Sequence, residues 1–320
     1  MKKWIATLLG TLAAASAIAQ GPWPQQPIRL IVPYAAGGST DTLARTLADG
    51  MQPGLGQSFV IDNRPGAATN IGVQALLQAR PDGYALMTAE NTTLFFNEHM
   101  FSKLPYSPEK DFTYIGPIGR LPVVLAVSPA FPARNFEEFL TYVRANPDKV
   151  TYASPGIGTM HHMAMELLKD KAGLKMQHVA YKGGAQAVQD VVAGHVPVMM
   201  LELTVGQQYI KSGKLRALAV ASDQRIAGMP GVPTFAEAGV KDMKAYTVHG
   251  LVGPAGMPAD VVARLNAELQ KAVKQPRFVA LMADTGFESI SATPVEFRAM
   301  SRAESARWGK VVKDSGVKLD

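Results

Sequence analysis

The sequence predicts an α/β protein with two lobes, each built on a doubly wound parallel sheet, and a ligand site in the cleft between the lobes. Apolar runs of strand length alternate with segments of helical periodicity along most of the chain, the pattern of such sheets. Two glycine-rich loops that join a strand to a helix, at 34–41 and 154–159, each belong to their own series of these units. Loops of this kind gather beyond the carboxyl ends of parallel strands, where open sheets bind ligands.

The composition is that of a globular protein. Of its 320 residues, 47% are hydrophobic and 18% are charged. A chain of this length is expected to form about two domains. The absence of cysteine excludes disulfides, thiolate catalysis and cysteine-ligated metals. The formal net charge of +6 is mild and dispersed, and no basic run carries interleaved aromatic residues, so we expect no nucleic-acid partner.

The first 19 residues have the form of a secretory signal peptide. Lys2 and Lys3 precede a short apolar stretch, and Ala17-Ile18-Ala19 has the A-x-A form of a cleavage site. No later stretch approaches the ~20 uninterrupted apolar residues of a membrane span. We therefore expect an exported, periplasmic protein, and the loss of the two lysines lowers its net charge to +4.

The first series of units alternates strands and helices, with turn or cap signals between them. Apolar, β-branched residues at 28–32 end at Pro33, and Ser39 or Thr40 caps the helix that follows. One long strand is expected at 114–127, although glycine and proline interrupt it. The elements between are a strand at 57–61, a helix from 70 to 79, a strand at 84–88 and a helix or loop opened by 90–93.

The second series follows the same alternation. Asn135 caps its first helix, and Gly173 and Gly194 end two later helices. Its elements are expected in the order helix 136–145, strand 150–153, helix 160–172, strand 178–181, helix 185–193, strand 196–201, short helix 205–211 and strand 216–221. The chain ends with a strand at 246–252 and helices at 259–274, 276–285 and 294–315.

These units divide between the two lobes. We expect the first lobe to consist of 25–120 together with 246–320, and the second lobe of 121–245. The hinge is expected at 119–127 and 246–252, where the chain crosses between the lobes.

The loop at 34–41 has the features of an anion site. Gly37 and Gly38 permit positive φ and let a ligand approach the backbone closely. The first-turn amides of the next helix have no intrahelical partners, so the loop is suited to a carboxylate or a phosphate. The alternative is a βα turn in which the glycines serve only the backbone.

A resemblance to a known family runs along the whole mature chain. The segment PIRLIVPYAAGGSTD at 27–41 resembles the opening of the Bug receptors, the periplasmic substrate-binding proteins of tripartite tricarboxylate transporters. Further motifs of that family follow in order: NRPG at 63–66, PDGY at 81–84, LPY at 104–106, YAS at 152–154 with GT at 158–159, YKG at 181–183, GKLRALA at 213–219, VPT at 232–234, EAG at 237–239 and WGK at 308–310.

This resemblance implies a type II periplasmic-binding-protein fold that closes on its ligand and delivers it to a membrane permease. Family ligands are mostly carboxylates, including amino acids and aromatic acids, and one carboxylate is held between the two glycine-rich loops, partly through water. Carried over by position, Tyr34 forms a wall, the first loop donates hydrogen bonds and the second loop completes the carboxylate clamp. The expected ligand-binding residues are Tyr34, Ala36, Gly37, Gly38, Ser39, Asp41, Glu90, Ser154, Gly158, Thr159, His162, Tyr181, Glu202 and His249.

Asp41 complicates this clamp because it lies in the first helical turn, where it already offsets the helix dipole. A bare carboxylate beside it would be repelled, whereas a bridging water or a ligand ammonium removes the conflict. The alternative is a plain acid at a helix N-terminus, without a role in the site.

Three positions depart from the usual family pattern and leave the ligand open. Leu201-Glu202 stands where many members have Asp-Asn, His249 replaces a common aromatic, and the loop at 88–92 is unusually acidic because of Glu90. Since these positions tend to face the distal end of the ligand, Glu90 and Glu202 would disfavour a second carboxylate and favour an amine, a hydroxyl or an aromatic monoacid. The alternative is that both glutamates are solvated.

We expect neither a metal site nor an enzyme. His161 and His162 are adjacent on a helix and point ~100° apart, and His162 with Glu166 has no evident third ligand. We expect His162 to line the cleft or to orient the loop at Ser154. No G-x-S-x-G, Walker or G-x-G-x-x-G motif occurs, so no cofactor is expected. A secreted serine hydrolase and a ligand-sensing module of the same fold remain as alternatives, and we expect a monomer.

Overall fold

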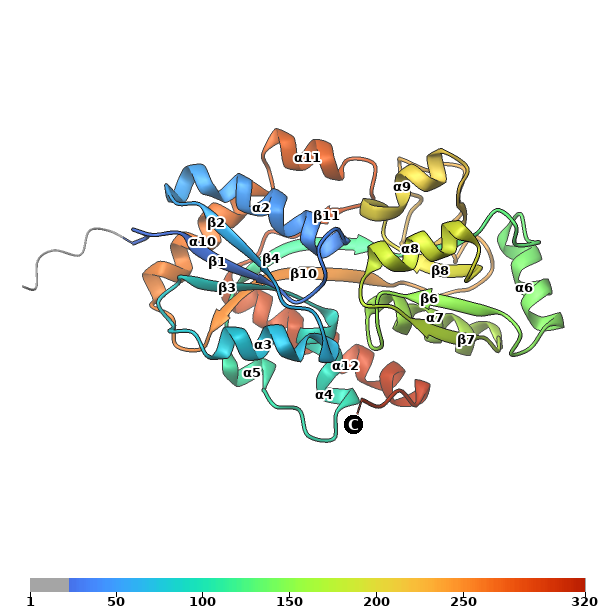
Figure 1. The fold of residues 1–320 in the computed structure, drawn as a ribbon, viewed down its shortest axis with the longest axis horizontal. Coiled ribbons are helices and arrows are strands. Elements are labelled where there is room, and N and C mark those ends of the chain that lie inside the picture. The colour runs from blue at the N-terminus through green and yellow to red at the C-terminus, as the bar shows by residue number, and fades with distance from the viewer. Residues whose placement is uncertain (1–22, 320) are drawn as a thin grey trace, which may run out of the picture.

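The computed structural model describes residues 23–319, so the predicted signal peptide at 1–19 lies outside the described residues. Two sheets lie one beyond the other along the long axis of the molecule, and helices pack on both (Figure 1). No helix in the described part of the chain combines the length and the apolar character needed to cross a bilayer.

The first sheet has the order β11-β4-β10-β3-β1-β2. Its strands are β1 (Ile28–Val32), β2 (Phe59–Asn63), β3 (Ala85–Glu90), β4 (Phe112–Pro122), β10 (Tyr246–Pro254) and β11 (Glu288–Ser289). β1 pairs in parallel with both β2 and β3, as the βαβαβ succession predicts, whereas β10 runs antiparallel between β3 and β4. β3 extends beyond its predicted end at Thr88, and this extension brings Glu90 opposite His249.

The second sheet has the order β7-β6-β8-β5-β9. Its strands are β5 (Val124–Val127), β6 (Thr151–Ser154), β7 (Gln177–Ala180), β8 (Val198–Leu201) and β9 (Arg216–Val220). β6 is parallel to β7 and β8, and β5 runs antiparallel between β8 and β9. Each sheet therefore combines a parallel set of strands with strands that run against it, which are β10 and β11 in the first sheet and β5 in the second.

The helices follow the predicted alternation, with several short additions. With the first sheet belong α2 (Ser39–Leu55), the 3₁₀ turn η1 (Ala67–Thr69), α3 (Asn70–Leu77), the π-helical turn η2 (Thr92–Phe96), α4 (Asn97–Met100), α5 (Pro108–Asp111), α10 (Ala259–Ala272), α11 (Pro276–Met282) and α12 (Pro294–Ser315). With the second sheet belong α6 (Phe136–Ala145), α7 (Met160–Ala172), α8 (Gly184–Ala193) and α9 (Leu203–Lys211).

The chain crosses between the sheets at a narrow junction. The single strand predicted at 114–127 is divided there, because β4 ends at Pro122 in the first sheet and β5 belongs to the second. Val123 lies between them and bonds to the other crossing segment: its amide donates to the carbonyl of Ala245 (3.1 Å), and its carbonyl accepts from the amide of Ala221 (2.9 Å). The prediction of one strand was wrong because Pro122 lacks an amide donor, and the backbone changes partners at that residue.

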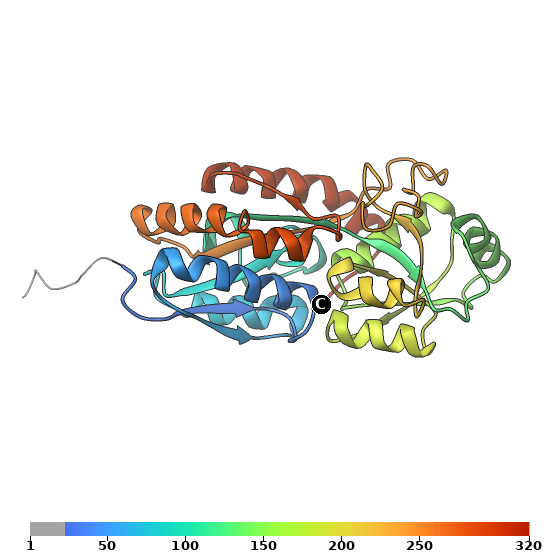
Figure 2. The same cartoon turned by 90° about the horizontal axis from the view of Figure 1, so that it is seen from above.

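A single apolar cluster also joins the two lobes. Its buried members include Phe96 and Met100 near the first sheet, Met160 and Met163 on α7, and Trp308 on α12. The rings of Phe96 and Trp308 meet edge to face, with centroids 5.5 Å apart. Seen from above, α12 runs along the first lobe towards the second (Figure 2), where it packs against α7. Met160 and Met163 are therefore core residues at the contact between the lobes.

The packing of α12 on β10 depends on a glycine. A methyl group added at Gly250 would overlap the ring of Phe297, so Gly250→Ala is expected to lower the free energy of unfolding by about 1–3 kcal/mol. Gly231→Ala is the matched control, because nothing lies within 4 Å of its added Cβ, and we expect a change within about 0.5 kcal/mol. Urea denaturation of both variants measures the difference, and equal effects would contradict this packing.

Candidate ligand-binding site

A small buried cavity lies between the lobes, beyond the carboxyl ends of β1, β3 and β8. Its volume is about 30 Å³, which is room for on the order of two water molecules at ~10–15 Å³ each. The lining residues come from both lobes: Tyr34, Ala35, Gly38, Ser39, Thr40, Glu90, Pro155, Thr159, His161, Gly184, Met199, Leu201, Glu202 and Val205. A ligand of several carbon atoms therefore requires the lobes to separate.

Four helices begin at this cavity, because Glu202, the N-cap of α9, also lines it. Gly38 is the N-cap of α2, Thr159 of α7 and Gly183 of α8. The caps of α2 and α8 supply no side-chain hydrogen bond, so first-turn amides of these helices remain available to a ligand. Their partial positive charge favours a carboxylate. The contribution of Gly184 to the lining was not predicted, although the run Lys182-Gly183-Gly184 before a helix is the same kind of signal as the other two loops.

Asp41 holds the first loop together and does not line the cavity. Its carboxylate accepts hydrogen bonds from the Gly37 amide (2.9 Å), the Asn63 side chain (3.0 Å) and the Arg45 guanidinium (3.0 Å). Burial opposes ionisation, but these bonds hold the pKa of Asp41 below its ordinary value. The expected water or ligand ammonium at Asp41 has no support here, because partners from the loop, α2 and β2 already occupy both oxygens.

The other expected residues of the first loop divide between the cavity and the surface. Tyr34, Gly38 and Ser39 line the cavity, and the Tyr34 hydroxyl donates to Oγ1 of Thr92 (3.2 Å). Ala36 and Gly37 are exposed. Gly37 lines a separate, open groove beside α8 and α9.

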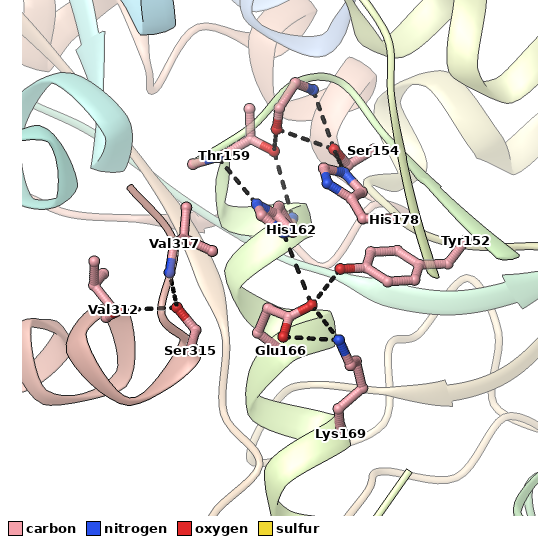
Figure 3. A network of polar contacts seen from close by, with 12 residues as sticks. Tyr152, Ser154, Thr159, His162, Glu166, Lys169, His178, Val312, Ser315 and Val317 are labelled. Atoms are coloured by element: carbon pink, nitrogen blue, oxygen red, sulfur yellow. Dashed lines mark hydrogen bonds and ion pairs between the residues drawn. The ribbon is translucent and has the colours of Figure 1, made fainter. Parts of the chain in front are cut away.

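The second loop is held from inside its own lobe. Figure 3 shows Ser154 and His178 pointing toward one another, with Oγ and Nε2 2.6 Å apart. Ser154 is fully buried, and its Oγ also accepts from the Gly156 amide (3.2 Å). Thr159 caps α7, donates to the Gly156 carbonyl (2.9 Å) and lines the cavity. Ser154 therefore shapes the loop and does not reach the cavity lining.

His162 orients this loop, which is one of the two roles expected for it. Its Nδ1 accepts from the Gly158 amide (3.1 Å), and its ring stacks on His178 with centroids 3.8 Å apart. Burial lowers the pKa of His162 to about 2, assisted by His178, so the ring is neutral. The neighbouring His161 lines the cavity instead. Its role was missed because adjacent helical residues diverge by ~100°, and the sequence alone did not indicate which of the two faces the cleft.

Tyr181 also lies outside the cavity lining. Its hydroxyl donates to Oδ2 of Asp190 (2.6 Å) on α8, so it ties the loop after β7 to the helix that follows it. Gly158 contributes through its backbone, because its carbonyl accepts from Oγ1 of Thr92 across the cleft (2.9 Å).

Glu90 is buried at the end of β3, 3% exposed, and lines the cavity. Its carboxyl accepts a hydrogen bond from the hydroxyl of Thr40, a lining residue that was not predicted. Burial, together with the nearby Glu202, raises the pKa of Glu90 to about 8. Glu90 is therefore mostly protonated at neutral pH, and the alternative that it is a solvated surface acid is wrong.

Glu202 is 1% exposed and lies between two imidazoles. Its Oε1 is 3.5 Å from Nε2 of His161, and its Oε2 is 4.0 Å from Nε2 of His249. Burial raises the pKa of Glu202 to about 7 and lowers the pKa of His161 to about 4 and that of His249 to about 3. Both imidazoles are thus neutral at pH 7, and neither pair is a full ion pair.

Several polar atoms in this group lack a hydrogen-bond partner within residues 23–319: Oε2 of Glu202, Nδ1 of His161, Oγ1 of Thr247 and both ring nitrogens of His249. Buried polar atoms are rarely left unpaired in proteins. Glu202 and His161 line the cavity, whereas His249, an expected site residue, lies behind Glu202 and is not part of the lining. A ligand or water at Glu202 and His161 would make missing hydrogen bonds. No group of three or more metal-binding side chains occurs in the described part of the chain.

Direct bonds bridge the cleft around the cavity. The Thr204 hydroxyl on α9 donates to Oγ of Ser39 on α2 (2.6 Å). Farther out, the Lys211 ammonium lies 3.1 Å from the Asp284 carboxylate. Together with the bond from Thr92 to Gly158, these contacts hold the lobes in a closed arrangement.

The comparisons with known proteins agree with one another. The model of the tripartite tricarboxylate transporter family receptor matches residues 43–317. A UPF0065 protein of Bordetella pertussis is 34% identical over 313 residues, which cover 98% of this chain and 96% of that protein. The structure of the periplasmic binding protein BugD is 33% identical, with a TM-score of 0.88, and the match covers 92% of this chain and 99% of BugD. A protein of R. palustris solved with adipate is 30% identical, with a TM-score of 0.89 and coverage of 92% and 99%. The two-lobed α/β fold predicted from the sequence is thereby confirmed.

The buried carboxyl groups predict a specific pH dependence of stability. The pKa values of about 8 for Glu90 and about 7 for Glu202 lie above the ordinary 4.5, so the folded state binds more protons than the unfolded state. The contribution of the two carboxyls to the free energy of unfolding is therefore fully present below their ordinary pKa. It is lost as the pH rises from that value through their pKa values in the folded state. The double variant Glu90→Gln/Glu202→Gln should therefore gain stability over the wild type as the pH rises, by on the order of a few kcal/mol between about pH 5 and pH 8.5. Urea unfolding of the ligand-free protein measures this difference, and a difference that does not change with pH would contradict it.

Proposed function

Because this chain belongs to the family of tripartite tricarboxylate transporter receptors, we propose that it is a periplasmic solute receptor. It captures a small carboxylate between its lobes, passes the ligand to a membrane permease and acts as a monomer without a cofactor. The proposed export is supported by the signal-peptide pattern at 1–19 and by the likeness to BugD, a periplasmic binding protein. The adipate in the related R. palustris protein supports a carboxylate ligand.

The observation that carries this proposal is the cavity itself. Helix N-termini from both lobes meet there: Gly38 and Ser39 belong to one lobe, Thr159 and Gly184 to the other. A carboxylate placed between them accepts hydrogen bonds from both lobes and is stabilised by the partial positive charge of the helix ends. Such a ligand stabilises the closed arrangement over an open one, since the full set of donors exists only when the lobes are together.

We propose that the lobes move about the junction at Val123 and Ala245, whose backbones are bonded to one another. The proposed first lobe is 25–120 with 246–320, and the second is 121–245. This division is supported by the change of sheet after Pro122. Opening about this hinge separates the helix N-termini and admits a ligand.

The hydrolase alternative is not favoured by the position of Ser154. Its hydroxyl is fully buried against His178 and bonded to the backbone of Gly156, so a substrate in the cavity does not reach it. The Ser154–His178 contact is better explained as a support for the loop.

The proposal predicts that small carboxylates stabilise the protein. A thermal-shift screen of the chain from residue 20 against aliphatic carboxylates, amino acids and aromatic acids should give at least one class that raises the melting temperature. A ligand at 100 times its Kd contributes about 2.7 kcal/mol of stability. Failure of all three classes, or release of a chemical product from a bound ligand, would overturn the proposed receptor function.

Gly38 tests whether the first loop forms the site. A Cβ at Gly38 has no atom closer than 3.8 Å, so Gly38→Ala should fold and bind. In Gly38→Leu the larger side chain projects into a cavity of about 30 Å³, and we expect it to lose ligand-induced thermal stabilisation while its ligand-free melting temperature stays near that of Gly38→Ala. Unchanged stabilisation by ligand in the leucine variant would remove this loop from the site.

Thr204 tests whether closure contributes to affinity. Thr204→Val removes the hydroxyl that bonds to Ser39 across the cleft and keeps the shape of the side chain. Since a hydrogen bond of this kind contributes about 1 kcal/mol, the Kd for the ligand found in the screen should rise about fivefold, mainly through faster dissociation. Thr46→Val is the matched control, because that hydroxyl bonds only to the Thr42 carbonyl within α2. Equal affinities of the two variants would show that the bond across the cleft has no role in binding.

A further inference from the structure

We infer that the ligand of this receptor carries an ammonium group as well as a carboxylate, and that Glu202, with Glu90 beside it, binds the ammonium. This inference rests on the proposed function and deepens it, because it assigns the end of the ligand that the N-termini of α2, α7 and α8 do not hold. The inferred ligand is a small amino acid. Its ammonium and carboxylate groups are either on the same carbon or separated by several carbons.

The first support is the geometry at Glu202. This side chain is 1% exposed and lines the cavity, and its Oε2 has no hydrogen bond of full geometry among the described residues. The hydroxyl groups of Thr247 and Ser39 lie close enough to lower its pKa, but neither carries a positive charge. An unpaired buried carboxylate oxygen is costly, and a ligand ammonium supplies both the missing donor and the opposite charge. The carboxyl of Glu90, from the other lobe, lines the same cavity, so the ammonium is reached from both sides of the cleft.

The second support is the set of groups around these carboxyls. The titratable groups that face them are Tyr34 after β1, His161 on α7 and His249 on β10. No lysine or arginine lines the cavity within residues 23–319. A second ligand carboxylate at this end would meet two carboxyl groups and no cation, whereas neutral imidazole nitrogens accept hydrogen bonds from an ammonium.

The charges of the cavity then form two complementary ends. The N-termini of α2, α7 and α8 favour a negative group, and the buried carboxyls favour a positive one. One ammonium needs only one carboxylate. We assign that role to Glu202, because its Oε2 has no hydrogen bond of full geometry among the described residues, whereas the Glu90 carboxyl already accepts a hydrogen bond from Thr40. Burial raises the pKa of both groups, so a carboxyl that binds the ammonium releases its proton.

The experiment compares ligands that share a carbon chain and differ only at the second end. Isothermal titration calorimetry of the wild-type protein uses 4-aminobutanoate, succinate and butanoate, and in a second set L-alanine and L-lactate. In at least one set, we expect the Kd of the amino ligand to be at least about tenfold lower than that of the other ligands. Its affinity should also rise from about pH 6 to pH 8, because the proton on Glu202 must leave for the ammonium to bind.

Two variants assign the effect to the carboxylate. Glu202→Gln keeps the size and hydrogen bonds of the side chain but removes its charge, and it should lose the preference for the amino ligand together with the rise in affinity with pH. Glu137→Gln, on the exposed face of α6, is the matched control and should keep both.

The outcomes separate this inference from the function on which it rests. If succinate, butanoate or L-lactate binds more tightly than its amino partner, or if Glu202→Gln keeps the amino preference, the ammonium assignment is wrong and the carboxylate receptor stands. If no ligand of these sets and no class of the wider screen stabilises the protein, both the inference and the proposed function are overturned.

Discussion

The structure depends on the placement of β10 between β3 and β4. This strand returns from the second lobe and completes the first sheet, so it ties the two lobes together and also passes directly beside the cavity. Its register sets His249 opposite Glu90 and within 4.0 Å of Glu202. Because the strand is fully buried along its length, the polar groups it carries cannot turn to solvent. The folded protein therefore bears the cost of desolvating these polar groups, and a ligand in the neighbouring cavity can offset it.

Periodicity and loop composition predicted much of the fold. The alternation of strands and helices, the two glycine-rich loops and the family resemblance together predicted the α/β fold with two lobes, and the comparisons confirm it. The division of 114–127 between two sheets was not predictable from local pattern, because both halves have strand composition and only the long-range pairing with β10 and β8 separates them. Local signals define an element more reliably than they define its partners.

The site shows the same limit at the level of single side chains. Asp41 belongs to the predicted loop, yet its oxygens accept hydrogen bonds from Arg45 and Asn63. Asn63 is the last residue of β2, outside the loop. His161 lines the cavity and His162 orients the loop, and this division depends on how α7 is rotated about its axis. Glu90 and Glu202 were singled out as departures from a family pattern, but their burial depends on the elements that surround them in the fold, which local sequence does not show. Sequence identified the residues that matter more readily than the direction in which each one points.

The apolar cluster shared by the lobes has a consequence for how this molecule is observed. Trp308 is 2% exposed within that cluster, its indole donates to the Glu304 carboxylate (3.1 Å) and the Arg307 guanidinium lies 5.5 Å from its ring. Indole emission responds to the polarity and charge of its surroundings. Because α12 packs against α7, the protein contains a native fluorophore at the contact between its two lobes. A change in that contact would be observable by rapid-mixing fluorescence without a dye or an added label.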